Sequence, residues 1–324
     1  MKNVYALQFT TSSRATISMK DNYNANDIKL EYSYNGDDWD TWNFKGLNIN
    51  SGDTLFIRGN NPDGFSRNEH VYCRFVMKGT DVGCSGNIMS LIDYRRTLDT
   101  IPCDYCFCGL FEDCTILTAA PDLPATKLSK HCYANMFASC SSLTTAPELP
   151  ATTLADYCYA FMFSLCKALK TAPELPAKGL AYSCYYHMFT YCTTLTSAPD
   201  LPATELAKSC YESMFDGCTS LKNAPELPAK TLADGCYYHM FYNCKDLKTA
   251  PELPATKPAK SCYEGMFAFC TSLKKKPEIP DFGLAKDCCT DMFLGCTSLK
   301  KKPKLTESYK SRMTFKEYCQ RNIL

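Results

Sequence analysis

The stretch CYAFMFSLCKALKTAPELPA, from Cys158 to Ala177, is one copy of a unit that repeats every 26 residues without an insertion. A Met-Phe pair lies between its two cysteines, and a leucine and a proline follow. The first cysteine recurs at Cys106, Cys132, Cys158, Cys184, Cys210, Cys236, Cys262 and Cys288, and the second at Cys114, Cys140, Cys166, Cys192, Cys218, Cys244, Cys270 and Cys296. A fixed period of this kind predicts a solenoid whose coils stack to bury their apolar sides.

The spacing within one unit predicts a short helix followed by a short strand. Leu154, Cys158 and Met162 are four residues apart and form an apolar stripe, while Thr153 and Asp156 fit an N-cap before it. The prolines of the APELPA segment stop the strand that follows, since proline has no N–H and a fixed φ. Each coil is therefore expected to be a helix, a short strand and an extended turn, with a period in the range of leucine-rich repeats, about 20–29 residues.

The rest of the chain differs from the repeat. Residues 1–80, called the leader below, contain short β-rich runs separated by Gly, Asn and Asp turns, which predict a small antiparallel β-sandwich. The predicted fold class is α+β, with this N-terminal β-sandwich followed by a right-handed solenoid of 26-residue coils. We expect a solenoid at residues 81–305, comprising an N-terminal cap at 81–105 and eight repeats at 106–305, and a C-terminal cap at 306–324.

Composition limits the possible partners. The 324 residues include 35 Lys and Arg and 34 Asp and Glu, so the formal net charge of +1 does not indicate a nucleic-acid partner. No apolar run reaches the roughly 20 residues that span a bilayer, so the chain is not expected to be membrane-spanning. The start, MKNVYALQFTTSS, lacks the apolar region of a signal peptide.

The cysteine columns admit four interpretations. Zinc or iron–sulfur binding needs four converging ligands, and a catalytic cysteine needs one activated thiolate, so sixteen equivalent cysteines disfavour both. A disulfide ladder is disfavoured because the stacked side chains point the same way, whereas packing fits a small apolar residue in a repeated slot. We favour packing, and expect no cofactor, no metal and no catalytic residue. A sporadic disulfide is expected instead among the cysteines outside the columns, Cys73, Cys84, Cys103, Cys108, Cys289 and Cys319.

Two sets of side chains that differ between coils are candidates for binding a protein or a glycan. Aromatic residues are expected to be exposed on the helical side and to act as anchors; they are Tyr186, Tyr191, Tyr238, Tyr242 and Phe269. A lysine column on the strand side is either a solvated face or a patch for anionic glycans; it comprises Lys222, Lys248, Lys274 and Lys300, beside an acidic column. In the leader, Trp39 and Trp42 are a sugar platform or, as we favour, part of the core.

The repeat C-Y-x-x-M-F-x-x-C-x-x-L-x-x-A-P-x-L-P resembles the BspA-like leucine-rich repeats of surface proteins from gut and oral Bacteroidetes. The resemblance covers about Cys106 to Leu305, which is all eight copies. It implies a non-enzymatic protein at the cell surface or outside the cell that mediates adhesion to host matrix or to other bacteria. Similar repeats also occur in phages of gut bacteria, which keeps open the alternative of a structural or host-attachment part of a virion. Neither hypothesis predicts an enzyme, and the ligand and the oligomeric state are not indicated.

Overall fold

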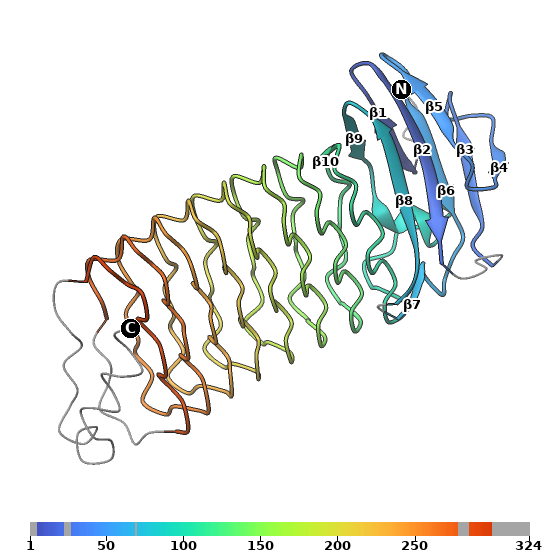
Figure 1. Cartoon of the computed structure of the whole chain (residues 1–324). Coiled ribbons are helices and arrows are strands. Elements are labelled where there is room, and N and C mark those ends of the chain that lie inside the picture. Colours follow the sequence, from blue (N-terminus) through green and yellow to red (C-terminus); the bar gives the residue numbers. More distant parts are fainter. Residues whose placement is uncertain (1–4, 23–26, 69, 278–284, 300–324) are drawn as a thin grey trace, which may run out of the picture.

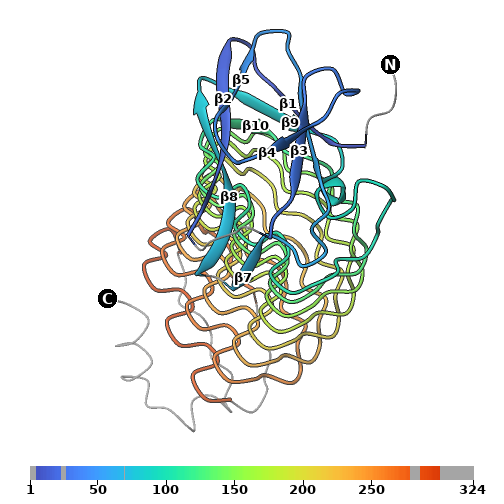
Figure 2. The same ribbon diagram turned by 90° about the vertical axis from the view of Figure 1, so that its right-hand side faces the viewer.

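The computed structural model of the chain describes residues 5–22, 27–68, 70–277 and 285–299. The β-rich leader covers one end of a regular stack of coils, which continues to the other end of the rod (Figures 1 and 2). The predicted C-terminal cap at 306–324 lies outside the described residues.

The leader contains strands in two sheets. The first sheet has the order β10-β9-β1-β6-β3-β4, with bounds Leu117–Ala119, Val82–Ser85, Leu7–Thr10, Leu55–Gly59, Leu30–Ser33 and Asp40–Trp42. The second has the order β5-β2-β8-β7, with bounds Leu47–Asn50, Arg14–Asp21, Val71–Gly79 and Ser66–Asn68. Alternation explains why these segments are strands: in β2, Ala15, Ile17 and Met19 are buried and the residues between them are not.

The two sheets share one hydrophobic core. The ring of Phe9 from β1 lies 5.3 Å from that of Phe75 in β8, and Trp42 stacks on Phe75 at 6.2 Å. All strand pairs in the two sheets are antiparallel except that of β10 with β9, two strands that follow the leader in the sequence. The leader therefore consists of two packed sheets, while its assignment to the β-sandwich class stays a prediction.

The leader also supplies the surface on which the first coil stacks. Phe75 stacks on Phe111 with ring centroids 5.0 Å apart, and the Phe75 N–H donates to the carbonyl of Leu110 at 2.8 Å. Strand β10 belongs to the first coil and pairs in parallel with β9. The core thus runs from leader to solenoid without a break, which hides the strand edges that an uncapped solenoid would expose. The division at residue 80 stays a prediction.

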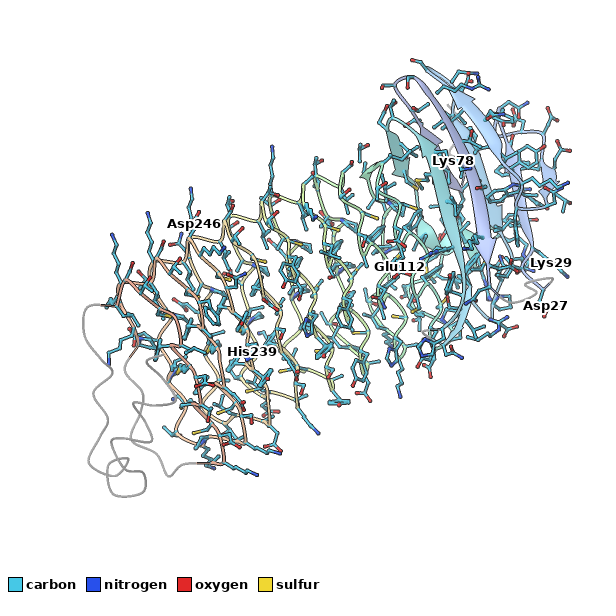
Figure 3. The ribbon with its side chains drawn as sticks, viewed as in Figure 1. Asp27, Lys29, Lys78, Glu112, His239 and Asp246 are labelled. Carbon is cyan, nitrogen blue, oxygen red and sulfur yellow. The ribbon has the colours of Figure 1, made fainter. Side chains whose placement is uncertain are left out.

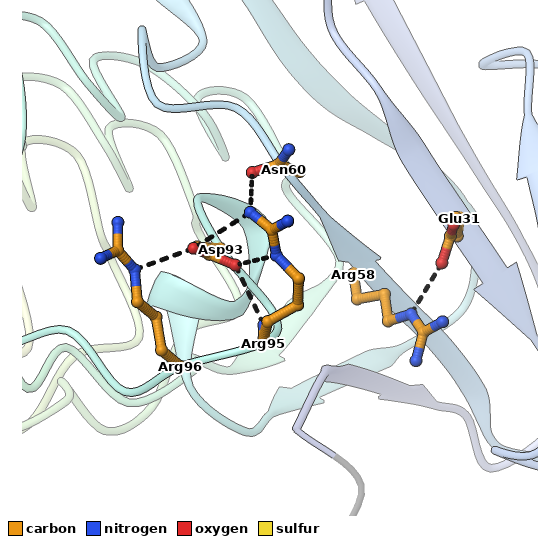
Figure 4. A network of polar contacts seen from close by, with 6 residues as sticks. All are labelled: Glu31, Arg58, Asn60, Asp93, Arg95 and Arg96. Carbon is orange, nitrogen blue, oxygen red and sulfur yellow. Dashed lines mark hydrogen bonds and ion pairs between the residues drawn. The ribbon is translucent and has the colours of Figure 1, made fainter.

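A short 3₁₀ helix, η1 (Ile88–Leu91), joins the leader to the coils. Asn87 caps it by accepting the N–H of Met89 at 2.8 Å. Just beyond it, the Asp93 carboxylate accepts hydrogen bonds from both Arg95 and Arg96, each at 2.8 Å (Figure 4). These arginine contacts hold the pKa of Asp93 at about 2.

The predicted helix of each coil is wrong: no α-helix occurs among the described residues. The segment from Ala155 to Cys166 is instead a ribbon of consecutive turns. Tyr157, Phe161 and Leu165 have left-handed backbones, with φ of 55°, 55° and 63°. A left-handed residue every four positions is incompatible with a continuous right-handed helix.

The hydrogen bonds of this turn ribbon alternate between two directions. Even-numbered amides close turns within the coil, as from the Cys158 N–H to the Ala155 carbonyl at 3.2 Å. Odd-numbered amides donate to the next coil, as from the Tyr159 N–H to the Cys184 carbonyl at 3.0 Å. In a helix, and also in this ribbon with its four-residue period, residues four apart such as Cys158 and Met162 face the same side. The spacing therefore suggested a helix when only the sequence was considered. The predicted N-cap is also wrong, because Asp156 accepts the N–H of Tyr182 in the next coil.

Beyond the turn ribbon, the coils meet through short parallel contacts. Single β-bridges join residues one period apart, such as Thr153 with Gly179 and Thr171 with Ser197. Within the described coils, only β10 is long enough to count as a strand. The expected short strand is thus reduced to isolated bridges, because the prolines that follow cannot extend the ladder.

The interior of the stack consists of ladders of identical side chains. The Phe163 ring lies 5.7 Å from Phe137 and 5.6 Å from Phe189, nearly parallel to both. A second ladder runs through Tyr159, which stacks on Tyr185 at 5.8 Å. These rings are essentially inaccessible to solvent. The prediction that equivalent residues fill the same interior slots is confirmed by these distances.

Candidate functional site

Most left-handed positions of the turn ribbon are partly or fully exposed, and several of them carry unusual side chains. Gly, Asn and Asp adopt this backbone most easily, yet several coils place large rings there or beside them. We call this surface the aromatic face; it comprises Tyr157, Phe161, Tyr182, Tyr186, His187, Tyr191, Tyr238, His239, Tyr242 and Phe269. Its backbone is held rigidly, since the Phe161 N–H donates to the carbonyl of Tyr186 at 2.8 Å.

The first cluster of the aromatic face joins two coils. Phe161 stacks on His187 with centroids 4.9 Å apart, and Tyr186 meets Phe161 edge-on at 5.2 Å. Tyr157 contacts Tyr182 edge-on at 5.0 Å, which extends the cluster along the coil. These pairings fix the orientations of rings that would otherwise rotate at the surface.

His187 is held as a neutral imidazole. The hydroxyl of Thr190 donates its proton to the Ser213 carbonyl at 3.0 Å, so it accepts from His187 Nδ1, also 3.0 Å away. Burial, and to a lesser extent the nearby His239, lowers the pKa of His187 to about 4. At neutral pH the ring therefore acts as an uncharged aromatic surface.

The second cluster lies farther along the stack. His239 stacks on Tyr238 at 4.1 Å and lies 4.8 Å from Tyr242, which meets Phe269 edge-on at 5.3 Å. The His239 ring covers Gly265 of the next coil so closely that a Cβ there would lie 2.2 Å from Cδ2. Figure 3 shows His239 on the broad side of the rod, below the edge that carries Asp246.

Between the clusters, a partly buried carboxyl lies near Tyr191 and Tyr242. Asp216 Oδ1 is inaccessible to solvent and has no hydrogen-bond partner within the described residues. Burial raises the pKa of Asp216 to about 6, and the Asp216 charge contributes, after burial, to the raised pKa of Tyr242. Tyr191 lies over the neighbouring Gly217, whose backbone N–H donates to the Tyr242 carbonyl at 2.9 Å. The site therefore combines aromatic rings with a carboxyl group, that of Asp216, which loses its proton near neutral pH.

The predicted aromatic residues are brought onto one face, but only two of them are as exposed as expected. Tyr191 is 46% exposed and Phe269 is 37% exposed. Tyr186, Tyr238 and Tyr242 are only half-buried rather than open, because they pack against neighbouring rings. Sequence reasoning placed them on a helix that does not exist, and it could not foresee ring contacts between coils.

The lysine column forms a separate surface. Lys222, Lys248 and Lys274 are exposed and follow one another in a backbone ladder, with the Lys274 N–H donating to Lys248 at 3.0 Å. The predicted fourth member, Lys300, lies outside the described residues. Figure 3 places Asp246, two residues before Lys248, at the edge of the rod.

The acidic column lies elsewhere on the coil, in the proline turns. Glu226 and Glu252 line a groove of about 440 Å³ between two coils, and Asp200 lines the equivalent groove one coil earlier. No ion pair links these carboxylates to the lysine column within the described ranges. The two columns, which the sequence places beside each other, are therefore not joined by direct ion pairs within the described ranges.

The leader tryptophans form no open platform. Trp42 is 4% exposed and its Nε1 donates to the Lys45 carbonyl at 2.8 Å, as expected for core packing. The guanidinium of Arg58 covers the Trp39 ring at 3.8 Å and the Tyr94 ring at 4.0 Å. Arg58 is itself held by Glu31 at 2.8 Å (Figure 4).

Most cysteines of the two columns are buried thiols that stay protonated near neutral pH. Burial raises the pKa of Cys166 and Cys184 to about 12, so their thiolates are not populated near neutral pH. No cluster of three or more His, Cys, Asp and Glu side chains is placed to hold a metal ion in the part of the chain that the structure describes. None of the described cysteines forms a disulfide.

The second cysteine of each coil has a more specific role than filling space. Cys166 Sγ lies 3.1 Å from the carbonyl oxygen of Phe137 in the preceding coil, and Cys192 Sγ lies 3.0 Å from that of Phe163. The same contact repeats along the whole column. A thiol is small enough for the interior slot and still donates a weak hydrogen bond, which distinguishes it from alanine or valine.

Sequence reasoning did not name several members of the aromatic face as binding residues, among them Tyr157, Phe161, His187 and His239. It also did not single out Asp216, which lies beside this face. Asp216 could have been found by comparing coils, since its column holds Ser164, Thr190, Tyr242 and Ala268 elsewhere. Apart from Glu112 in the first coil, Asp216 is the one acid in this column of hydroxyls and apolar groups, which indicates a local specialisation.

Comparison with known proteins adds little to this geometry. A scan against protein-family models found no match, and a search of curated proteins found none either. Among solved structures, the chain is similar to a leucine-rich-repeat protein of T. pallidum (TpLRR), with 14% identity, coverage of 74% of this chain and 88% of that chain, and a TM-score of 0.31. In the described part of the chain, no helix has the length and apolar character needed to cross a membrane.

Proposed function

We propose that this chain is a non-enzymatic interaction protein whose aromatic face binds a protein or a glycan. One observation carries the proposal: large rings occupy left-handed backbone positions on one face of the stack. A bulky residue in this conformation costs roughly 1–2 kcal/mol relative to an ordinary backbone. Such a cost at a surface indicates selection for something other than stability.

The array itself shows that the rings are not needed for folding. At the position of Tyr191 and Phe269, other coils carry Gly217, Asn243 and Gly295, which adopt the same backbone. Aromatic side chains lose little conformational entropy on binding and pack well against sugar rings or apolar side chains. The face therefore has the composition of a recognition surface added to a repeating scaffold.

The finer assignment rests on the repeat pattern. We propose a BspA-like leucine-rich-repeat protein of the Bacteroidetes type, presented at the bacterial surface and acting in adhesion. Each coil adds contact area to the aromatic face along the stack. Such a face therefore suits a large or repetitive ligand. The lysine column is a secondary candidate surface for anionic glycans.

The test is to screen the full chain on glycan and matrix-protein arrays and then compare matched variants. Tyr191→Asn and Phe269→Asn introduce a residue that the array already tolerates at that position, so the coils should fold. We expect the double variant to lose at least about tenfold in affinity for the best ligand, since aromatic anchors commonly contribute more than about 1.4 kcal/mol.

Lys222→Thr with Lys248→Thr is the control, because Thr196 occupies the same column. This control should retain binding. Full binding by the aromatic variant, together with loss in the lysine variant, would move the site to the lysine column. Turnover of any ligand on the arrays would contradict a non-enzymatic role.

A further inference from the structure

A pair of thiols outside the regular pattern lies where the cap meets the first coil. Cys103 and Cys106 enclose two residues, in the sequence Cys-Asp-Tyr-Cys. Cys106 is the first member of the first cysteine column. Cys103 has no counterpart, because the equivalent position is a serine in the second coil and an alanine in the six later coils, as at Ala155 and Ala181.

The repeat places the two cysteines at positions that lie close together in the later coils. In the third coil, the equivalent residues Ala155 and Cys158 are the ends of a turn closed by a 3.2 Å hydrogen bond. The ends of such a turn lie within about 7 Å, close to the separation of about 4.4–6.8 Å that a disulfide spans between Cα atoms. The Cys106 thiol lies close enough to the Cys103 thiol to lower the pKa of Cys103. Both pack against Gly64 of the leader, where a Cβ would lie 3.0 Å from Cys103 Sγ and 2.7 Å from Cys106 Cα.

Cys103 also differs from the other described cysteines in reactivity. It is half-buried rather than fully buried, a property it shares only with Cys296 within the described ranges. The hydrogen bond from Cys106, opposed by burial and assisted by the nearby Arg67, lowers the pKa of the Cys103 thiol. Burial raises the pKa of Cys296 to about 12. Cys288 has a lowered pKa through its neighbour Cys289, but both are buried.

We propose that Cys103 and Cys106 form a redox-active dithiol, which a low-molecular-weight disulfide such as oxidised glutathione converts to an intramolecular disulfide. Cys103, as its thiolate, attacks one sulfur of the small disulfide; that S–S bond breaks, and the departing thiolate takes up a proton. Cys106 then attacks the Cys103 sulfur of the mixed disulfide and expels the second small thiol, which takes the Cys106 proton. Two protein thiols are oxidised and one small disulfide is reduced to two thiols.

This modification is independent of the proposed binding function. It places a covalent link in the turn on which the leader packs, at the start of the solenoid. The other column cysteines stay reduced, because all of them but Cys296 are buried and the pKa of Cys296 is raised to about 12.

The experiment treats the folded, fully reduced chain with oxidised glutathione, alkylates the remaining thiols after unfolding, and maps the products by mass spectrometry. Cleavage on the amino side of Asp104 separates Cys103 from Cys106, so a disulfide between them keeps the two peptides linked. We expect loss of two free thiols per chain and this one linked pair. Before oxidation, Cys103 should alkylate at least about tenfold faster than any other described thiol, since one pKa unit changes the thiolate fraction about tenfold.

Matched variants separate the two steps. Cys103→Ala installs the residue found in the other coils and should abolish all oxidation. Cys106→Ala should fold as well and stop at a stable mixed disulfide on Cys103. Oxidation of other cysteines first, equal alkylation of Cys103 and the column cysteines, or no mixed disulfide in the Cys106→Ala protein would each overturn the proposal.

Discussion

Single residues in this protein adopt backbone conformations that their side chains disfavour. Leu165, Tyr191 and Phe269 all have φ near 60°, and each is among the most exposed large side chains of the described chain. The conformation is imposed by the turn ribbon, whose left-handed amides donate to the next coil. The side chain at such a position is therefore free to vary, provided that its backbone cost is offset by the hydrogen bonds between coils.

Replacing Leu165 with asparagine should stabilise the fold. Asn243 occupies the same position in another coil with φ of 57°. Because asparagine tolerates this backbone, Leu165→Asn should raise the free energy of unfolding by about 0.5 kcal/mol, after allowing for lost apolar contact. Urea denaturation measures the change. Leu165→Ala keeps the unfavourable backbone and should not stabilise, so identical results for the two variants would contradict the explanation.

Asp216 should make the fold less stable as pH rises from about 4 to about 6. Its folded pKa of about 6 lies above the ordinary value of 3.8, so the folded state holds the proton over a range where the unfolded state has lost it. Stability therefore falls with increasing pH in this window and is level above it. Asp216→Asn should remove that dependence and add about 1 kcal/mol at pH 7, an amount discounted because the side chain is partly exposed.

Thermal melts of the two proteins at several pH values provide the measurement. The Asp216→Asn protein should differ from the wild type at pH 7 and converge with it below pH 4. A constant difference across the whole range would mean that the effect comes from packing and not from the ionised carboxylate. His187, whose pKa is lowered to about 4, acts in the opposite direction in both proteins and cancels in the comparison.

The structural unit of this fold is the coil, and each coil carries side chains that pack closely against the next coil. Where one coil carries a ring at a left-handed position, the following coil often carries glycine below it: Tyr191 lies over Gly217 and His239 over Gly265. Inside, the thiol of each second cysteine reaches the carbonyl of the preceding coil. Neighbouring coils are thus complementary in detail, although their interior residues repeat.

Two glycines with the same backbone test this complementarity. Gly265 and Gly235 have φ of 57° and 61°, but only the Gly265 position has a ring within 2.2 Å of a Cβ, whereas the nearest atom to Gly235 lies at 3.2 Å. Gly235→Ala should cost about 1 kcal/mol for its backbone alone, and Gly265→Ala about 2 kcal/mol or more, because His239 must also move.

The His239 ring provides a second measurement. Burial lowers its pKa in the folded protein. If alanine at position 265 expels the ring, an NMR titration should show the His239 pKa returning toward its ordinary value. An unchanged titration in Gly265→Ala, with the same loss of stability as in Gly235→Ala, would show that the ring does not depend on the glycine.

At the scale of the whole molecule, the chain is a one-dimensional stack closed at one end by the leader. Ladders of Phe and Tyr continue from Phe65 and Phe75 in the leader through the first coil and onward. Each coil contacts only its neighbours, so stability is approximately a sum of coil and interface contributions.

Removing one whole period should leave the fold intact. Deletion of residues 184–209 removes 26 residues and joins Ser183 to Cys210, which restores every ladder. The shortened chain should unfold cooperatively with a smaller dependence on urea, because less surface becomes exposed. Deletion of one residue fewer, 184–208, shifts the register at the junction and should abolish cooperative unfolding. Equal behaviour of the two deletions would contradict a stack that depends on register.

Much of the fold could be predicted from the sequence because its period is constant. A residue that recurs every 26 positions must occupy equivalent places, so the inward direction of Cys158, Met162 and Phe163 followed from the repeat and was confirmed. The local conformation did not follow. A four-residue turn period and a helix place nearly the same residues inward, and the choice depends on whether amides bond within the coil or to the next one.

The sequence likewise predicted only part of the candidate site. Variation between coils identified Tyr191 and Phe269 as surface residues, since a position that changes while the core repeats must face outward. Their left-handed backbones, the glycines beneath the rings and the unpartnered carboxyl of Asp216 depend on contacts between residues about one period apart. Repetition within the sequence thus determined the stack and its interior, whereas hydrogen bonding between coils, which exists only in the assembled structure, decided the backbone and the shape of the face.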